Sequence, residues 1–107
     1  MINYYDWAEY QSRMHSNKIA ITDYFLNKKI SYKELNLSAC KIANFLQSKD
    51  IGHSDRIAIL SKNHSIFFEL QFACSKIGSI MVPLNWRLTA NELSFILNDC
   101  EPSLLIV

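Results

Sequence analysis

Residues 76–98 read KIGSIMVPLNWRLTANELSFILN, and this stretch decides the fold. Residues 80–82 form a short apolar run, and a polar turn led by proline follows it. The apolar positions between residues 89 and 100 then recur at helical spacing, and Thr89 with Glu92 forms a T-x-x-E capping box at their start. The stretch therefore predicts a strand, a turn and a capped helix in that order.

Two further helices are predicted upstream by the same spacing. The apolar positions of residues 31–49 lie on one helical stripe, and Ser31 opens a second capping box. Residues 66–77 repeat the stripe. Gly52 and Gly78 stand just beyond these two segments, where a left-handed residue commonly stops a helix. We expect the two glycines to end the two helices.

Continuous apolar runs separate the predicted helices, at residues 57–60, 80–82 and 104–107. Strands of this kind, alternating with helices, are typical of a parallel sheet that is covered on both faces. The sequence therefore predicts an α/β fold in three layers, with a mostly parallel sheet and helices on both faces. Upstream, residues 19–25 and 29–32 are predicted to form an antiparallel pair of strands, and a short helix is expected around Tyr4, Trp7 and Ala8.

The fold is expected to be incomplete within these residues. Val107 ends the last apolar run with no crossover helix after it, so one face of that strand has no predicted cover. Phe68 and Phe72 add an apolar strip beside the main stripe of the second long helix. We expect either more protein or a second copy of the chain to cover Phe68, Phe72 and the last strand.

Composition narrows the class of protein. The 107 residues suffice for one domain. A net charge of +1 with 20% charged residues is typical of a globular protein, and not of a disordered or a nucleic-acid-binding protein. The longest apolar run falls short of the roughly 20 residues of a membrane span, and the N-terminus does not read as a signal peptide. The chain is therefore expected to be soluble and cytoplasmic.

The cysteines and histidines suggest no chemistry. The cysteines form no C-x-x-C pair and stand beside no histidine at metal-ligand spacing, so reduced core thiols are expected rather than a disulfide, a metal site or a catalytic thiol. These cysteines are Cys40, Cys74 and Cys100. Surface or capping roles are expected for the three histidines, His15, His53 and His64.

Several segments, in this order and spacing, resemble the AMP-forming acyl-CoA and aryl-CoA synthetases of the adenylate-forming superfamily. They are ISYKEL at residues 30–35, IGHSDRIAI at residues 51–59, Asn63, KIG at residues 76–78 and VPLNWRLT at residues 82–89. Ser54 is a departure, because it stands where the family usually has glycine. Asn85 and the pair Leu88-Thr89 favour the CoA-ligase branch over the adenylation domains of peptide synthetases.

The resemblance implies that residues 1–107 are the N-terminal portion of the large adenylating domain of an acetyl-CoA synthetase-like fold, truncated before the phosphate-binding loop. The intact enzyme would use ATP, Mg²⁺ and CoA to convert a small carboxylic acid into an acyl-adenylate and then into a thioester. Its catalytic lysine and phosphate loop would lie beyond this chain. With only two glycines the chain has no phosphate-cradling loop of its own, so we assign no catalytic residue and no metal ligand, and expect none of these cofactors to bind the chain tightly alone.

Ligands of open parallel sheets bind beyond the carboxyl ends of the strands, which here selects residues 61–64 and 83–87. Arg87 is the one candidate binding residue. Its guanidinium and the free N–H groups of the helix capped by Thr89 are expected to hold the nucleotide phosphates of CoA in the intact enzyme. A surface arginine on a turn is the alternative. The neighbours Asn63 and Asn85 are expected to satisfy backbone groups, and Trp86 to act as a wall or a lid.

Two hypotheses about the function of the chain stay open. The first is the inactive scaffold fragment of a ligase described above. The second is a stand-alone interaction module that keeps the fold and forms an oligomer through its extra phenylalanines. An unrelated doubly wound domain, such as a response-regulator receiver, would need a cluster of acidic residues at the strand ends, which this sequence lacks.

Overall fold

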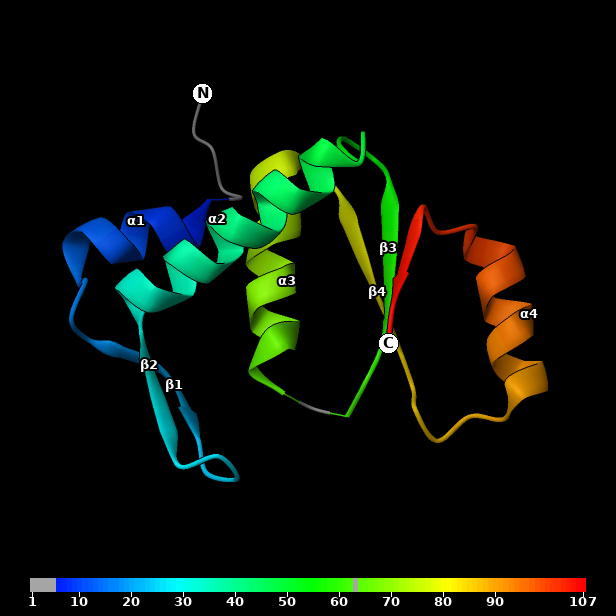
Figure 1. Cartoon of the computed structure of the whole chain (residues 1–107), viewed down its shortest axis with the longest axis horizontal. Coiled ribbons are helices and arrows are strands. Elements are labelled where there is room, and N and C mark those ends of the chain that lie inside the picture. The colour runs from blue at the N-terminus through cyan, green and yellow to red at the C-terminus, as the bar shows by residue number, and fades with distance from the viewer. Residues whose placement is uncertain (1–5, 63) are drawn as a thin grey trace.

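The computed structural model describes residues 6–62 and 64–107 (Figure 1). In chain order the elements are α1 (Trp7–Met14), β1 (Ile19–Asp23), β2 (Lys28–Ser31), α2 (Tyr32–Ser48), β3 (Arg56–Leu60), α3 (Ser65–Ile77), β4 (Ile80–Leu84), α4 (Ala90–Cys100) and β5 (Leu104–Ile106). Tyr4 and Asn63, which the sequence analysis singled out, lie outside the described residues. Within those ranges, no helix combines the length and apolar character needed to cross a membrane.

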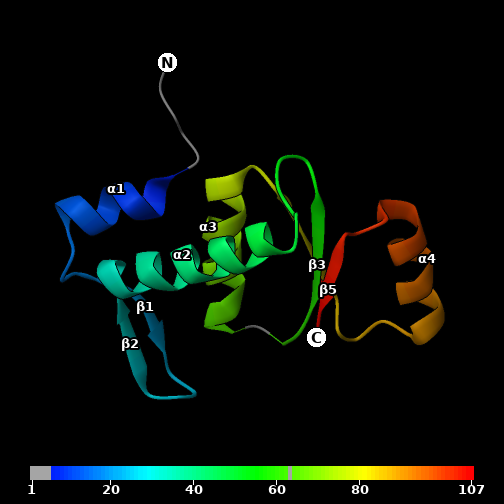
Figure 2. The ribbon, with the colours of Figure 1, turned by 45° about the horizontal axis from the view of Figure 1, so that its top comes forward.

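The main sheet is parallel and has the strand order β4-β3-β5. The central strand β3 pairs with both neighbours, so that Ile57 lies beside Met81 on one side and beside Leu104 on the other. Pro83 lies within β4, opposite Ile59. In Figures 1 and 2, α2 and α3 stand on one side of this sheet and α4 stands on the other. The predicted three-layer α/β fold with helices on both faces is confirmed.

The two-sided arrangement follows from the strand order and the handedness of crossovers. The connection from β3 through α3 leads to β4, and the connection from β4 through α4 leads back across β3 to β5. Crossovers between parallel strands are right-handed in nearly all proteins, so two crossovers that run in opposite directions along a sheet place their helices on opposite faces.

The core lies between β3 and the helices α2 and α3. Its fully buried side chains include Leu46 from α2, Ile57 and Ile59 from β3, and Leu70 from α3. Burial of each such side chain stabilises the fold by about 1.5–3 kcal/mol. The apolar stripes of α2 and α3 and the continuous apolar strand β3 therefore pack together in one core.

The two long helices meet at small residues. Ala39 and Ala43 of α2 form a buried cluster with Ala73 of α3, and Phe72 packs against it. The α2 helix therefore supplies part of the cover of Phe72, a contact that the helical pattern alone could not reveal, and Phe72 stays half buried. Phe68 is 50% exposed, and it remains an uncovered apolar side chain.

The helix α4 forms a thin third layer. None of its residues is fully buried, and Phe95 is 76% exposed. Its predicted apolar stripe, at Leu93, Ile96, Leu97 and Cys100, is only half buried. The sheet is therefore closely covered on the α3 side and loosely covered on the α4 side.

Both predicted capping boxes are present. Ser31 and Glu34 exchange hydrogen bonds at the start of α2, and Thr89 and Glu92 do so at the start of α4. These boxes satisfy backbone N–H groups that a helix leaves without a partner at its first turn. Gly78 ends α3 in the left-handed region at φ +76°, as predicted.

The predicted stop of α2 at Gly52 is wrong, because the left-handed residue is Asp50 at φ +58°. The Asp50 amide donates to the carbonyl of Gln47, and the Ile51 amide donates to the carbonyl of Leu46. This is a Schellman motif, in which the residue after the left-handed one contacts the last turn of the helix. Ile51 and Leu46 share the core, so burial of Ile51 fixes the reversal two residues before the glycine.

The N-terminal hairpin forms as predicted, but its first strand ends two residues early and its second strand, Lys28–Ser31, is shifted by one residue. The strand β1 stops at Asp23 because the carboxylate of Asp23 accepts hydrogen bonds from the amides of Phe25 at 3.0 Å and Leu26 at 3.1 Å. Such a turn takes the next residues out of the ladder. Asn27 completes the turn at φ +49°, so the connection is longer than the sequence suggests.

The cysteines are free thiols. Cys74 is buried in the main core, while Cys40 and Cys100 are half buried. Burial raises the pKa of the Cys74 thiol to about 11, so it stays protonated near neutral pH and is a poor nucleophile. The structure therefore supports a packing role for Cys74.

Candidate functional site

The carboxyl ends of β3 and β4 define the candidate site. These strands are neighbours, yet the helix that follows β3 and the helix that follows β4 lie on opposite faces of the sheet (Figure 2). The two following loops therefore diverge and leave a crevice between them. Crevices of this kind, at the point where connections change face, are where open α/β sheets bind ligands.

The crevice holds an open hollow of about 430 Å³. It is lined by Ser61, Phe67, Pro83, Leu84, Asn85, Trp86 and Arg87. Phe67 belongs to α3, whereas the other residues come from the ends of β3 and β4 and the loops after them. The structure therefore brings together most of the two segments that the sequence selects, and Arg87 lies among them.

The turn after β4 fixes the position of the Arg87 backbone. The side-chain oxygen of Asn85 accepts a hydrogen bond from the Arg87 amide at 3.0 Å. The carbonyl oxygen of Asn85 accepts a second bond, from the Leu88 amide at 3.1 Å. The prediction that Asn85 satisfies backbone groups is confirmed. An asparagine in this role holds the turn in one conformation and so restricts the directions that Arg87 can take.

Two cations lie over the indole of Trp86. The Lys62 Nζ atom is 4.8 Å from the centroid of the Trp86 ring, and the Arg87 Cζ atom is 5.2 Å from it. Cations at this distance are attracted by the negative face of an aromatic ring, an effect of about 0.5–1 kcal/mol at exposed sites. Trp86 therefore does more than line the crevice, because it also holds the two charged groups.

The N-terminus of α4 carries a negative charge of its own. Glu92 Oε1 accepts hydrogen bonds from the Thr89 amide at 3.4 Å and from the Thr89 hydroxyl at 3.0 Å. A carboxylate in the first turn already complements the positive end of the helix, and it repels a second anion. The side chain of Arg87, rather than the N-terminus of α4, is therefore the feature that suits a phosphate.

The histidines take the capping and surface roles that were predicted. His64 is the N-cap of α3, and its Nδ1 atom accepts a bond from the Ile66 amide at 3.3 Å. His15 follows α1 as its C-cap. The His53 ring lies against Gly78. Across residues 6–62 and 64–107, the structure shows no group of three potential metal-ligating side chains.

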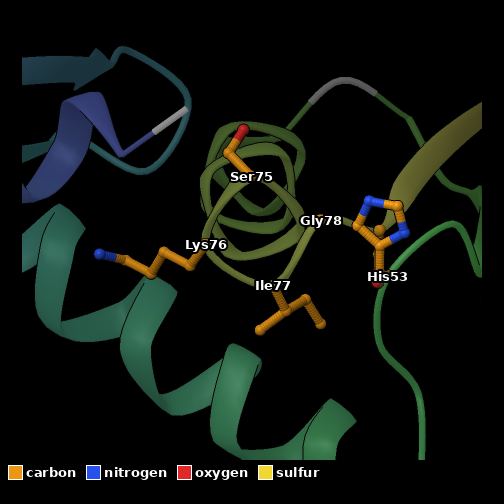
Figure 3. Close-up of a pocket in the computed structure, with 6 residues that line it drawn as sticks. His53, Ser75, Lys76, Ile77 and Gly78 are labelled. Carbon is orange, nitrogen blue, oxygen red and sulfur yellow. The ribbon is translucent and has the colours of Figure 1, made fainter. Parts of the chain in front are cut away.

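A second hollow, of about 530 Å³, lies at the opposite end of the sheet. Figure 3 shows its lining, where His53 and Gly78 face each other and the side chain of Lys76 runs away from them toward α2. Lys76 Nζ donates to Asp6 Oδ1 and to Asn36 Oδ1, each at 2.7 Å, and the Lys76 side chain is only 10% exposed. Its charge therefore joins α1, α2 and α3, and the hollow has no cation to offer a ligand.

The contact of Lys62 with the Trp86 ring was not predicted from the sequence. The sequence places Lys62 in a selected segment but does not single it out, and only the pairing of Leu60 with Leu84 shows how the two loops start side by side. A parallel register that matches the last residues of two strands brings the second residue after each strand close together. That register is the signal that could have identified Lys62 and Trp86 as neighbours.

Comparison with known proteins gives one consistent family. The family described as AMP-binding enzyme matches residues 8–107. A fatty acid–[acyl-carrier-protein] ligase of Streptomyces coeruleorubidus is 38% identical over 78 residues, which are 73% of this chain and 15% of the relative. An indoleacetate–CoA ligase of Aromatoleum aromaticum is 31% identical over 102 residues, which are 95% of this chain and 20% of the relative.

A solved structure agrees with the sequence relatives. The N-terminal domain of FACL13 from Mycobacterium tuberculosis superposes with a TM-score of 0.91 at 28% identity, over 97% of this chain and 26% of that domain. This chain thus spans 15% to 20% of the length of the two curated relatives described above. The match in fold extends over nearly all of its residues.

Proposed function

Because the chain belongs to the AMP-binding enzyme family, we propose that it is the N-terminal portion of the large adenylating domain of an AMP-forming acyl-CoA ligase. The proposal places residues 1–107 before the phosphate-binding loop. Its support is the short share of each relative that the chain spans, 15% and 20% for the two ligases above. The chain matches the N-terminal domain of a solved member over 26% of that domain's length.

In the intact enzyme, ATP with Mg²⁺ would activate a small carboxylic acid as its acyl-adenylate, and CoA would then take the acyl group as a thioester. The names of the relatives include a fatty acid and indoleacetate as acids, which supports a carboxylic acid as substrate class. They include an acyl carrier protein as well as CoA as acceptor. Asn85 and the pair Leu88-Thr89 favour the CoA-ligase branch over the adenylation domains of peptide synthetases, and CoA is the acceptor in this proposal.

This part of the enzyme is proposed to act as a scaffold with one binding contribution. The observation that carries the proposal is the crevice at the ends of β3 and β4, where Asn85 fixes the turn and Arg87 stands beside an open hollow. Its guanidinium would contact the nucleotide phosphates of CoA, since the planar fork of arginine suits phosphate oxygens. The 107 residues alone would neither catalyse the reaction nor bind these cofactors tightly.

The coding sequence beyond the codon for Val107 tests the domain assignment. The proposal requires an open reading frame there that encodes a Ser/Thr/Gly-rich loop ending in Pro-Lys. A stop codon directly after Val107 would contradict it. That outcome would favour the alternative, a non-catalytic interaction module.

Arg87→Ala in the full-length enzyme is expected to raise the KM for CoA about tenfold with little change in kcat, because the lost contact binds substrate and transition state alike. Steady-state kinetics with varied CoA measures it. Arg13→Ala is the matched control, since Arg13 lies on α1 and pairs with Glu9 at 2.9 Å. An unchanged KM for CoA in the Arg87 variant would exclude the contact.

The interaction module has one observation in its favour. Phe68 is 50% exposed and Leu105 of the last strand is 40% exposed, so apolar surface remains on α3 and at the edge of the sheet. The rest of the adenylating domain or a second copy of the chain would cover this surface. Monomeric behaviour of the chain at every concentration, measured by sedimentation, would count against the second copy.

A further inference from the structure

The turn between β1 and β2 carries the two most exposed large apolar side chains of residues 6–62 and 64–107. Tyr24 is 90% exposed and Phe25 is fully exposed, and Leu26 beside them is 58% exposed. Figures 1 and 2 show this turn at the outer end of the hairpin, which projects away from the main sheet. We call Tyr24, Phe25 and Leu26 the aromatic tip. A cluster of large apolar side chains in water, unlike a single one, is typical of a contact surface.

The aromatic tip is separated from the nearest helix. An open hollow of about 510 Å³ lies between the hairpin and the start of α3. Tyr24 and Phe25 line it on the hairpin side, and Phe67 and Phe68 line it on the helix side. The side chains of the tip can therefore enter another apolar phase without breaking a contact of the core.

Lysines follow the aromatic tip along the chain. Every charged residue from position 24 to position 33 is a lysine, namely Lys28, Lys29 and Lys33. Lys28 and Lys29 are exposed, and none of the ion pairs found among the described residues involves either of them. The surface next to the tip therefore carries positive charge, and this charge attracts an anionic partner.

Two backbone amides of the aromatic tip already have a hydrogen-bond partner. Oδ1 of Asp23 accepts bonds from the Phe25 amide at 3.0 Å and from the Leu26 amide at 3.1 Å. A backbone N–H group that leaves water without a partner costs free energy. Asp23 supplies the partner within the turn, so the tip can leave water at a lower cost. The same bonds direct the carboxylate of Asp23 toward the backbone of the turn.

The charge of the lysines distinguishes between two partners for the aromatic tip. In a symmetric dimer a surface contacts its own copy, so Lys28 and Lys29 would lie near the same two lysines of the second chain, and like charges repel. A bilayer with anionic lipids instead offers an apolar interior to the tip and negative head groups to the lysines. The charge therefore favours a lipid surface.

We propose that the aromatic tip inserts into the surface of a bilayer that contains anionic lipids, with Lys28 and Lys29 at the level of the head groups. The contact is peripheral, because only the turn of the hairpin enters the lipid. Aromatic side chains suit the boundary between head groups and acyl chains, and each lysine adds attraction to the negative surface. The proposal goes beyond the function proposed above and does not depend on it.

The test is sedimentation of the 107-residue chain with vesicles of phosphatidylcholine, with and without about a third of phosphatidylserine, at low and constant ionic strength. We expect saturable binding to the anionic vesicles that added salt weakens. Lys28→Gln and Lys29→Gln should each weaken this binding about fivefold. Phe25→Ser should weaken it about tenfold. Phe25 is fully exposed, so its replacement leaves the core of the chain intact.

Phe95→Ser and Lys49→Gln are the matched controls. Phe95 is 76% exposed on α4, on the other side of the main sheet from α2 and α3. Lys49 is an exposed lysine at the C-terminal end of α2. Both variants should bind anionic vesicles as the parent chain does.

Phe25→Trp tests insertion directly, because a tryptophan replaces an aromatic ring at the tip. The variant should keep its binding to anionic vesicles. Lipids with brominated acyl chains should quench its fluorescence more strongly than that of the parent, whose tryptophans are Trp7 and Trp86. Equal quenching of the two proteins would overturn the proposal.

Several other results would overturn the proposal. They are no binding to anionic vesicles, a loss for Phe95→Ser as large as that for Phe25→Ser, and full binding when Lys28 and Lys29 are both replaced by glutamine. Dimer formation that Phe25→Ser abolishes, without vesicle binding, would assign the tip to a second copy of the chain. Vesicle binding by the 107 residues but not by the full-length enzyme would assign the tip to the rest of the adenylating domain. The proposed function fails separately, by a stop codon directly after Val107, and that outcome leaves vesicle binding unaffected.

Discussion

Gly78→Ala is expected to lower the free energy of unfolding of the chain by about 2–4 kcal/mol. Gly78 ends α3 at φ +76°, a backbone conformation that disfavours any residue with a Cβ atom. An added Cβ would also lie 2.9 Å from Cδ2 of the His53 ring. The strain and the steric overlap act together, so the loss should exceed that of an ordinary glycine substitution.

The loop that carries His53 cannot easily retreat. The Ser54 amide donates to the Gly78 carbonyl at 2.8 Å, and the Ile80 amide donates to the Asp55 carbonyl at 2.8 Å. The Ser79 hydroxyl donates to the Gly52 carbonyl at 2.7 Å. These bonds hold the loop before β3 against the end of α3, so the new methyl group would have to displace the His53 ring.

Urea denaturation followed by circular dichroism measures the effect, and Gly52→Ala is the control. A Cβ at Gly52 would meet no heavy atom within 4 Å, and the left-handed glycine of the chain is Gly78. The control should change the free energy of unfolding by no more than about 1 kcal/mol, or raise it slightly. His53→Ala in the Gly78→Ala background should restore the steric part alone. Equal unfolding midpoints for the two glycine variants would show that the overlap is relieved at no cost.

Leu70→Ala is expected to lower the free energy of unfolding by about 3–5 kcal/mol. Leu70 lies on α3 at 0% exposure, in the same cluster as Ile57 and Ile59 of the central strand. Truncation would remove buried apolar atoms and leave a cavity between α3 and β3. Small domains are stable by only about 5–15 kcal/mol, so this single change should remove a large part of the stability.

Phe68→Ala is the matched control, since Phe68 lies on the same helix two residues earlier and is 50% exposed. It should cost no more than about 1 kcal/mol. The comparison separates burial from helix propensity, because both variants place alanine in α3. A loss for Phe68→Ala as large as that for Leu70→Ala would mean that the exposed face of α3 is covered in solution.

Features set by neighbouring residues were predictable from the sequence. The capping boxes at Ser31 and Thr89 depend on a partner three residues away, and the left-handed Gly78 depends on the helix that it ends. The parallel sheet was predictable because its strands read as unbroken apolar runs between helices, although only the central strand β3 is largely buried. Their carboxyl ends then located the crevice around Arg87.

Features set by distant residues were not predictable. The end of α2 depends on the burial of Ile51 in the core, which overrides the preference of Gly52. Lys76, part of the KIG segment, binds Asp6 and Asn36, which lie 70 and 40 residues away along the chain. The approach of Lys62 to Trp86 depends on the register between two strands. No local pattern contains this information.

Pro83 makes the two borders of the main sheet unequal. In the part of the chain that the structure describes, β4 and β5 each pair with β3 alone, so each has an outer border of main-chain groups. A proline has no N–H to donate, and it lowers the capacity of β4 to template another strand. The two edges of the sheet therefore differ in how readily a further strand could add to them. The β5 edge keeps all of its backbone N–H donors, while the β4 edge resists unwanted strand addition and aggregation.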